Sequence, residues 1–225
     1  MKKLLCSVAA LCFLAPGAQA QVRRPFIRAL GQGSVSVQPD LAKIHIGVVT
    51  QASTAQDAST QNATKLSAVL SQLRQVLGST AEIKTVNYTL TVNYTHPNGG
   101  GAPVLNGYTA TNIVEVSTTD LTIVGKAIDT ATQAGANNIQ SLQFTLKDDQ
   151  PARMQALKAA SQQAKAHAEA IASGVGARTG AVLALKEDNS RDVTPLFAAL
   201  STATPVQPGA LVVTATVTLD MELIQ

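Results

Sequence analysis

Apolar and polar residues alternate over several stretches of the chain, as expected of strands that bury one face. The clearest alternation covers residues 83–94, where Val86, Tyr88 and Leu90 share one face and threonine and asparagine occupy the other. It predicts a half-buried antiparallel strand whose partner returns at 108–117. Similar patterns predict further strands at 26–37, 41–50, 139–146, 181–186 and 210–223.

Two other stretches repeat apolar residues every three or four positions, which predicts helices with one buried stripe. The first stripe runs over 66–77 and stops at Gly78, a residue suited to the left-handed position after a helix. The second begins near Thr119-Asp120, either of which can cap a helix, and ends at Gly135. Both helices are expected to cover one side of a sheet.

A third and longest helix is predicted after Asp148-Asp149, with Pro151 in its first turn. The adjacent carboxylates have two interpretations, a pair for acid–base chemistry or cation binding, and a cap that complements the helix dipole. The cap requires no further residue and is preferred. The expected buried stripe is mostly alanine, so the helix should lie close to the surface it covers: Met154, Leu157, Ser161, Ala164, Ala168, Ile171 and Val175.

The resulting order is β-β-α-β-β-α-β-α-β-β. It predicts an α+β fold in which about three helices cover a mostly antiparallel sheet. An outer-membrane barrel also alternates, but three helices and few aromatic residues argue against one. Gly31 and Gly33 fall inside the first strand, where glycine indicates a bulge or a close backbone approach.

The beginning of the chain has the features of an export signal. Lys2-Lys3 precedes an apolar run at 4–14 that is too short to span a bilayer as a helix, and Ala18-Gln19-Ala20 fits a cleavage site. Residues 1–20 are therefore predicted to be a cleaved secretory signal peptide, and residues 21–225 a single exported domain. No long apolar run follows, so no transmembrane segment is expected in the mature chain.

Cleavage changes the charge and the cysteine count. The full chain has 17 Lys and Arg against 14 Asp and Glu; without Lys2 and Lys3 the balance is 15 against 14, so the net charge falls from +3 to +1. Such a balance gives no reason to expect a nucleic-acid partner. Cys6 and Cys12 are also removed, which excludes a disulfide framework, a thiolate nucleophile or a cysteine-based metal site. Low charge permits self-association.

The sequence offers few candidates for catalysis. His45, His96 and His167 have no metal-ligand spacing and no neighbouring nucleophile in the sequence, so structural or surface roles are preferred. Gly31-Gln32-Gly33 lacks the Lys-Ser/Thr ending of a phosphate loop and opens no helix. No catalytic, cofactor-binding or metal-binding residue is therefore predicted, and the chain is expected not to be an enzyme.

The segment Gly135-Ala136-Asn137-Asn138 separates the second helix from the next strand. Its two amides could grip a ligand, or the segment could be a joint between the two elements. Gly135 suits the left-handed turn out of the helix, and the asparagines can bond nearby backbone groups before the strand begins. The joint is the preferred interpretation.

Several segments together resemble the SIMPL domain family of exported bacterial proteins. In order over residues 28–224 they include GQGSVSVQPDLAKIHIGV, GYTATNIVEVS, AIDTATQAGANNIQSLQF and the alanine-rich third helix. The resemblance implies an α+β fold, a location in the periplasm or associated with the envelope, including the outer membrane, and self-assembly into ring-like or cage-like homo-oligomers. It also implies a link to oxidative or envelope stress. It supplies no catalytic residue and no cofactor.

Three functions are compatible with these observations. The leading hypothesis is a non-enzymatic periplasmic protein that self-assembles and takes part in oxidative or envelope stress tolerance. The second is an envelope binding module that recognises a protein or a small ligand through the loops at 96–107 and 188–208, since long loops are often functional, although both can equally be exposed connectors. The third and most remote is a hydrolase or metalloenzyme whose site is assembled from residues distant in the sequence.

Overall fold

The computed structural model describes residues 24–97, 100–195 and 208–225. The predicted signal peptide at 1–20 lies outside the described residues, and so does the part of the polar stretch that spans 196–207. Within the described ranges, no helix combines the length and the apolar character needed to cross a bilayer.

The described elements follow one another in the expected order, and the α+β class is confirmed. The helices are α1 (Ala55–Leu77), α2 (Val124–Gln133) and α3 (Gln150–Gly174), with short 3₁₀ turns at Gly78–Thr80 and Leu121–Ile123. The strands are β1 (Phe26–Val37), β2 (Leu41–Ala52), β3 (Glu82–Thr95), β4 (Val104–Thr118), β5 (Asn138–Thr145), β6 (Arg178–Pro195) and β7 (Leu211–Ile224).

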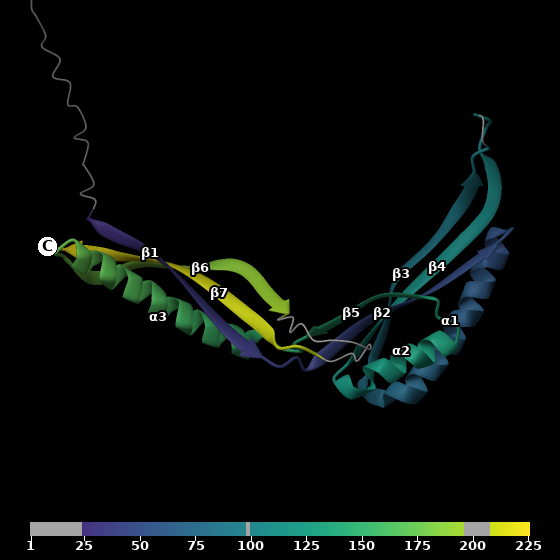
Figure 1. Cartoon of the computed structure of the whole chain (residues 1–225), viewed down its shortest axis with the longest axis horizontal. Helices are drawn as coiled ribbons and strands as arrows, with labels where there is room; N and C mark the ends of the chain where they lie inside the picture. Colours follow the sequence, from purple (N-terminus) through teal and green to yellow (C-terminus); the bar gives the residue numbers. More distant parts are fainter. Residues whose placement is uncertain (1–23, 98–99, 196–207) are drawn as a thin grey trace, which may run out of the picture.

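The strands divide between two antiparallel sheets (Figure 1). The larger sheet has the order β3-β4-β2-β5, and the smaller has the order β1-β7-β6. Helices α1 and α2 cover one face of the larger sheet, and α3 covers one face of the smaller. Pairing of β1 with β7 brings the first and last strands together, with Phe26 opposite Glu222.

The chain passes between the two sheets at Asp40, between the end of β1 and the start of β2. Strands β1 and β2 do not pair with each other, and the chain crosses back after β5 on its way to α3. Hydrogen bonds connect the two segments that cross between the sheets. The amide of Asp40 donates to the carbonyl of Thr145 (3.2 Å), and the Asp40 carboxylate accepts from the amide of Lys147 (2.7 Å).

Helix α1 is longer than its apolar stripe suggested. It begins at Ala55, where the Thr54 hydroxyl caps it by accepting a hydrogen bond from the amide of Asp57 (3.1 Å). It ends at Leu77, and the next residue, Gly78, has the positive φ (67°) for which glycine was expected. The stripes of α1 and α2 meet β2 and β4 in a core whose fully buried members include Ile44, Ile46, Val69, Leu73, Val114, Val116 and Val124.

One polar side chain of α1 is buried inside this core. Asn62 is 1% exposed, and its side-chain amide donates to the carbonyls of Val48 (2.8 Å) and Ala110 (3.0 Å). It therefore fastens the helix to two neighbouring strands, β2 and β4. Its own carbonyl oxygen and that of Asn112 on β4 are buried without a protein hydrogen-bond partner.

Helix α3 packs through a different stripe from the one expected. Ala164 and Ala168 are buried as predicted, but Met154, Ile171 and Val175 are exposed. The buried side chains of α3 repeat every fourth residue and are all alanine: Ala152, Ala156, Ala160, Ala164, Ala168 and Ala172.

Direct contact between two backbones explains the alanine stripe. Gly31 and Gly33 face α3 from β1, and a Cβ atom added to either glycine would clash with a helix carbonyl, that of Ala160 or Ala156 respectively. Only the smallest side chains fit at this separation, so larger residues such as Met154 are turned outward. The close backbone approach predicted from the two glycines is confirmed.

The same helix also protects the free edge of β1. The carbonyl of Leu30 is hydrogen-bonded to Nδ1 of His167 (2.9 Å), and the amide of Gln32 donates to the Gln163 side chain (2.6 Å). Gln163 and His167 lie one helical turn apart, so they reach successive outward-facing groups of the strand. An incoming strand could not pair with β1 at this point.

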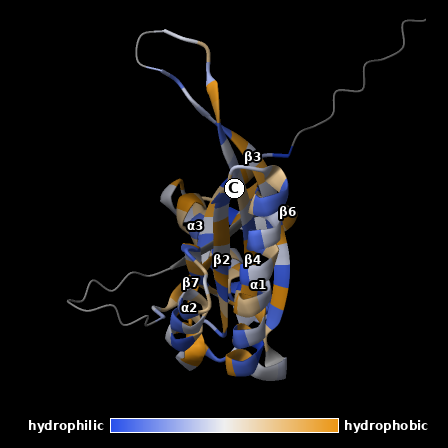
Figure 2. Cartoon of the chain, turned by 90° about the vertical axis from the view of Figure 1, so that its right-hand side faces the viewer, coloured by the Kyte–Doolittle hydropathy of each residue, from blue (hydrophilic) through white to orange (hydrophobic). Residues whose placement is uncertain are grey.

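The prediction of a half-buried strand at 83–94 is wrong in one respect. The strand exists as β3 and pairs antiparallel with β4, with a register shift between Thr85 and Asn87. However, its apolar face is exposed, because α1 covers β2 and β4 and leaves this outer strand uncovered. The hairpin of β3 and β4 projects past the end of α1 (Figures 1 and 2).

Both long loops are shorter than predicted. Strand β3 ends at Thr95 and β4 begins at Val104, so only 96–103 connects the two strands. Strand β6 continues to Pro195, with Asp192 to Pro195 paired to β7, so the first part of the stretch at 188–208 is strand.

Candidate functional site

The structure brings together a row of polar side chains that are far apart in the sequence. In the register of the larger sheet, His45 on β2 lies opposite Glu115 on β4 and opposite Ser141 on β5. His45 alternates with the buried Ile44 and Ile46, so the row lies on the sheet face opposite α1 and α2.

Hydrogen bonds connect the three side chains through the imidazole. Nε2 of His45 lies 3.1 Å from the Glu115 carboxylate, and Nδ1 lies 3.1 Å from the Ser141 hydroxyl. A carboxylate can only accept, so Nε2 carries a proton, and in the neutral ring Nδ1 accepts from the serine. This hydrogen bond lowers the pKa of the Glu115 carboxyl; its burial acts in the opposite direction, and the nearby charges of Lys43 and Lys84 lower the pKa further.

The row contains the residue types of a serine hydrolase triad in a different arrangement. In such triads the serine bonds to Nε2 and the carboxylate to Nδ1, whereas here Ser141 is at Nδ1 and Glu115 is at Nε2. The row lies on an open sheet face, and neither of the two described pockets includes it. We therefore interpret it as a cross-strand polar ladder that joins β4, β2 and β5.

This ladder predicts a pH-dependent contribution to stability. Because the folded-state pKa of Glu115 is lowered, its contribution is present above the ordinary carboxyl pKa and is lost as the pH falls through the folded value. We expect the coupling between His45→Gln and Glu115→Gln in a double-mutant cycle to be about 0.5–1 kcal/mol near neutral pH. Urea unfolding at a series of pH values should show that the coupling is lost as the pH falls through the folded-state pKa of Glu115; a coupling that stays constant with pH would contradict this assignment.

The other residues considered for chemistry remain separate from this row. His167 serves the edge of β1, and His96 lines a second hollow of about 330 Å³ together with Tyr94 and Pro103. Within the described ranges, no group of three or more His, Cys, Asp or Glu side chains is placed to hold a metal ion.

The adjacent carboxylates before α3 act at the helix start, with one change from the expectation. The side chain of Asp148 accepts a hydrogen bond from the amide of Gln150 (3.0 Å). Asp149 occupies the N-cap position, but its side chain makes no capping bond. Pro151 lies in the first turn as predicted.

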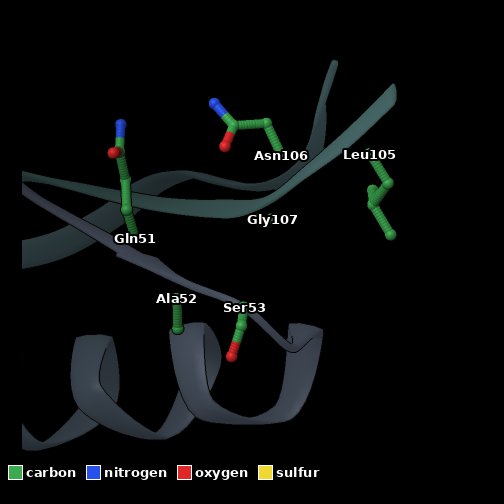
Figure 3. A pocket seen from close by; sticks show the side chains of 6 residues that line it. All are labelled: Gln51, Ala52, Ser53, Leu105, Asn106 and Gly107. Carbon is green, nitrogen blue, oxygen red and sulfur yellow. The ribbon is translucent and has the colours of Figure 1, made fainter. Parts of the chain in front are cut away.

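One hollow lies where the predicted loop at 96–107 ends. It has a volume of about 470 Å³ and is lined by Gln51 and Ala52 at the end of β2, by the following residue Ser53, and by Leu105, Asn106 and Gly107 of β4 (Figure 3). The side chains of Gln51 and Asn106 point to the same side, whereas Ala52 and Ser53 point toward α1 (Figure 3). The hollow offers neutral hydrogen-bonding groups and no charged side chain.

Gly107 explains why the backbone is closely packed at this hollow. Its φ is 90°, and an added Cβ atom would lie 2.6 Å from the carbonyl oxygen of Ala52. The pairing of β3 with β4 shifts register here, since Val92 is opposite Tyr108 and Tyr94 is opposite Leu105. A bulge at the base of the projecting hairpin therefore forms one wall of the hollow.

The segment Gly135-Ala136-Asn137-Asn138 is a joint, as predicted. Gly135 has a φ of 115°, and the amide of Ala136 donates to the carbonyl of Ala131 (2.9 Å) to close the end of α2. The side chain of Asn137 donates to the carbonyl of Val49 and accepts from its amide, both at 2.8 Å. The side-chain amide group of Asn137 thus continues the pairing of β5 with β2, and it is not free to bind a ligand.

Sequence reasoning missed the row of His45, Glu115 and Ser141 because no motif spacing connects these residues. The available signal was the alternation of β2, which places His45 on the polar face. Correct pairing of β2 with both β4 and β5 would have been needed to find its neighbours.

The chain is similar to known proteins over most of its length. The model of the SIMPL family, described as a protein of unknown function (DUF541), matches residues 27–221. The chain belongs to the SIMPL family. The match extends from the second residue of β1 into β7, so both sheets and all three helices of this SIMPL chain are covered.

Two kinds of individual protein are similar to this SIMPL chain, each with 28% sequence identity. The 26 kDa periplasmic immunogenic protein of Brucella melitensis is 28% identical over 166 residues, which is 72% of this chain and 66% of that protein. The uncharacterized protein YggE of Escherichia coli is 28% identical over 162 residues, which is 72% of this chain and 65% of that protein. The matched region thus spans just under two thirds of the length of these relatives.

Proposed function

We propose that this SIMPL chain is a non-enzymatic periplasmic protein that works as a self-assembled homo-oligomer. The observation that carries the proposal is the amount of large apolar side chain that a single copy exposes. Such residues lie on three separate surfaces, along β3, on β6 and on the outer side of α3. Exposed apolar surface of this kind often marks a site of protein–protein contact.

The amino-acid composition and the names of related proteins support the same proposal. Charged residues make up only 14% of the chain, so copies repel one another weakly. The predicted signal peptide, together with relatives that are named periplasmic, supports export to the periplasm. A ring or a cage is the form of assembly that we propose.

Light scattering tests the assembly. The chain purified from the periplasm should have a mass that is a multiple of the protomer mass at micromolar concentration. A clean monomer under these conditions would contradict the proposal.

The proposed role of this assembly is tolerance of oxidative or envelope stress. Both cysteines lie in the predicted signal peptide, so we propose that the exported chain protects indirectly and not through thiol chemistry. A strain that lacks the gene should grow less well under peroxide or envelope-disrupting detergent, and the gene should restore growth. Equal growth with and without the gene would remove this role.

A second candidate is a binding module in the envelope, favoured by the hollow lined by Gln51 and Asn106. Two side-chain amides that point to the same side can bond an amide or a carboxyl group of a ligand. Ligand-induced NMR shifts near this hollow that disappear in a Gln51→Ala, Asn106→Ala double variant would favour this candidate over assembly alone.

A further inference from the structure

Strand β3 is an open edge of the larger sheet. In the described part of the chain it pairs with β4 alone, so one side of its backbone is left without a strand partner. One edge strand of the smaller sheet, β1, is protected by Gln163 and His167 of α3. No comparable side chain bonds to the outer edge of β3 among the described hydrogen bonds.

The uncovered face of β3 is apolar along most of its length. Helix α1 is linked to this face at Tyr88, whose hydroxyl donates to Ser59 (3.0 Å). Beyond this contact the strand runs out with the projecting hairpin, which Figure 2 shows to carry hydrophobic residues. The exposed fractions along this face are 49% for Val86, 49% for Tyr88, 41% for Leu90, 39% for Val92 and 57% for Tyr94.

Edge strands of monomeric proteins usually carry features that prevent pairing, such as charged side chains or proline. From Thr85 to Thr95 strand β3 contains neither a charged residue nor a proline. Its residues are instead threonine, valine, tyrosine, leucine and asparagine, mostly types that favour strands. An uncharged edge of this length is suited to accept another strand.

The sequence of β3 is a repeat that is self-complementary in the antiparallel direction. The five residues TVNYT occur at 85–89 and again at 91–95, with Leu90 between them. If two copies of the strand run antiparallel about Leu90, Thr89 lies opposite Thr91, and Tyr88 lies opposite Val92. Such threonine pairs and aromatic–aliphatic pairs are favourable across antiparallel strands.

We propose that β3 pairs with β3 of a second copy about a two-fold axis at Leu90. This inference rests on the proposed self-assembly and identifies one of its interfaces. The part of β3 between its two register shifts runs from Asn87 to Val92. It contains the pairs closest to the axis, Thr89 with Thr91 and Tyr88 with Val92. Two four-stranded sheets then join into one, and the two apolar faces lie side by side.

Cysteine cross-linking tests this register directly, because Cys6 and Cys12 both lie in the predicted signal peptide. Under mild oxidation Leu90→Cys should form a disulfide-linked dimer, since the two introduced cysteines face each other at the axis. Tyr88→Cys alone and Val92→Cys alone should not, because each lies four residues, or about 13 Å, from its own copy across the axis. A mixture of these two variants should cross-link, since residue 88 lies opposite residue 92.

A charge at the axis provides a second test. Leu90→Lys places two lysines opposite each other, so the particle mass measured by light scattering should fall at least twofold. Leu90 is already 41% exposed in one copy, so the thermal unfolding of the variant protomer should be retained.

The outcomes separate this interface from self-assembly in general. An oligomer by light scattering in which neither Leu90→Cys nor the mixture cross-links would overturn the β3 interface and leave the proposed assembly standing. Equal cross-linking of Leu90→Cys, Tyr88→Cys and Val92→Cys, each alone, would also overturn it, because random encounters produce that result. A monomer at micromolar concentration would overturn both proposals.

Discussion

Gly33→Ala is expected to cost about 3 kcal/mol or more of unfolding free energy, although it adds a single methyl group. Its new Cβ atom would overlap the backbone carbonyl of Ala156 and lie 2.8 Å from the side chain of Ala159. Backbone atoms cannot move aside as a flexible side chain can, so α3 must shift away from β1 and lose contacts along its length. Urea unfolding followed by circular dichroism measures the loss.

Ser34→Ala is the matched control for this prediction. Ser34 is the next residue of the same strand, but its exposed side chain lies on the opposite face, where it bonds to the Thr214 hydroxyl (3.2 Å). We expect a change of about 0.5 kcal/mol or less for this surface substitution. Similar costs at Ser34 and Gly33 would contradict the direct backbone contact that we describe.

Asn62→Asp is expected to cost about 3–5 kcal/mol near neutral pH. The position is 1% exposed, and the amide that donates to the carbonyls of Val48 and Ala110 would be replaced by a carboxylate oxygen that repels both. A buried, unpaired charge carries a penalty of this size. Chemical denaturation measures this loss of unfolding free energy.

The pH dependence of this variant identifies the cause. Burial should raise the pKa of the introduced carboxyl above its unfolded value, so the folded variant takes up a proton as the pH falls. The penalty relative to the natural chain should therefore shrink toward acidic pH. Asn62→Leu, which has similar size and no charge, should show a smaller and nearly constant penalty; equal pH dependence of the two variants would contradict this explanation.

Much of the fold could be predicted from local patterns, and the errors of that prediction have specific causes. The alternation of β3 and the stripe of α1 identified their elements, because strand and helix periodicity are local properties of the sequence. The burial of α3 was misjudged because apolarity favoured Met154 and Ile171 over alanine. The deciding factor was the pair of glycines on β1, more than a hundred residues away.

The residues of the candidate site were even harder to predict from local sequence patterns. His45 could be placed on a polar strand face, but its neighbours Glu115 and Ser141 depend on which strands pair and in which register. Register is a property of the assembled sheet. The joint at Gly135 and Asn137 was predicted because a turn out of a helix is governed by local chemistry, although the partner of Asn137 on β2 was not.

The sequence by itself determined the kinds and order of the elements, the positive-φ glycines Gly78 and Gly135 that follow α1 and α2, and the family to which the chain belongs. These depend on periodicity and on conformations that each residue allows locally. Only the tertiary structure decided that the strands form two sheets, that α3 rests on two glycines and that the apolar face of β3 stays uncovered. The reason is that burial depends on which surfaces meet, and those surfaces are brought together by contacts between residues far apart in the chain.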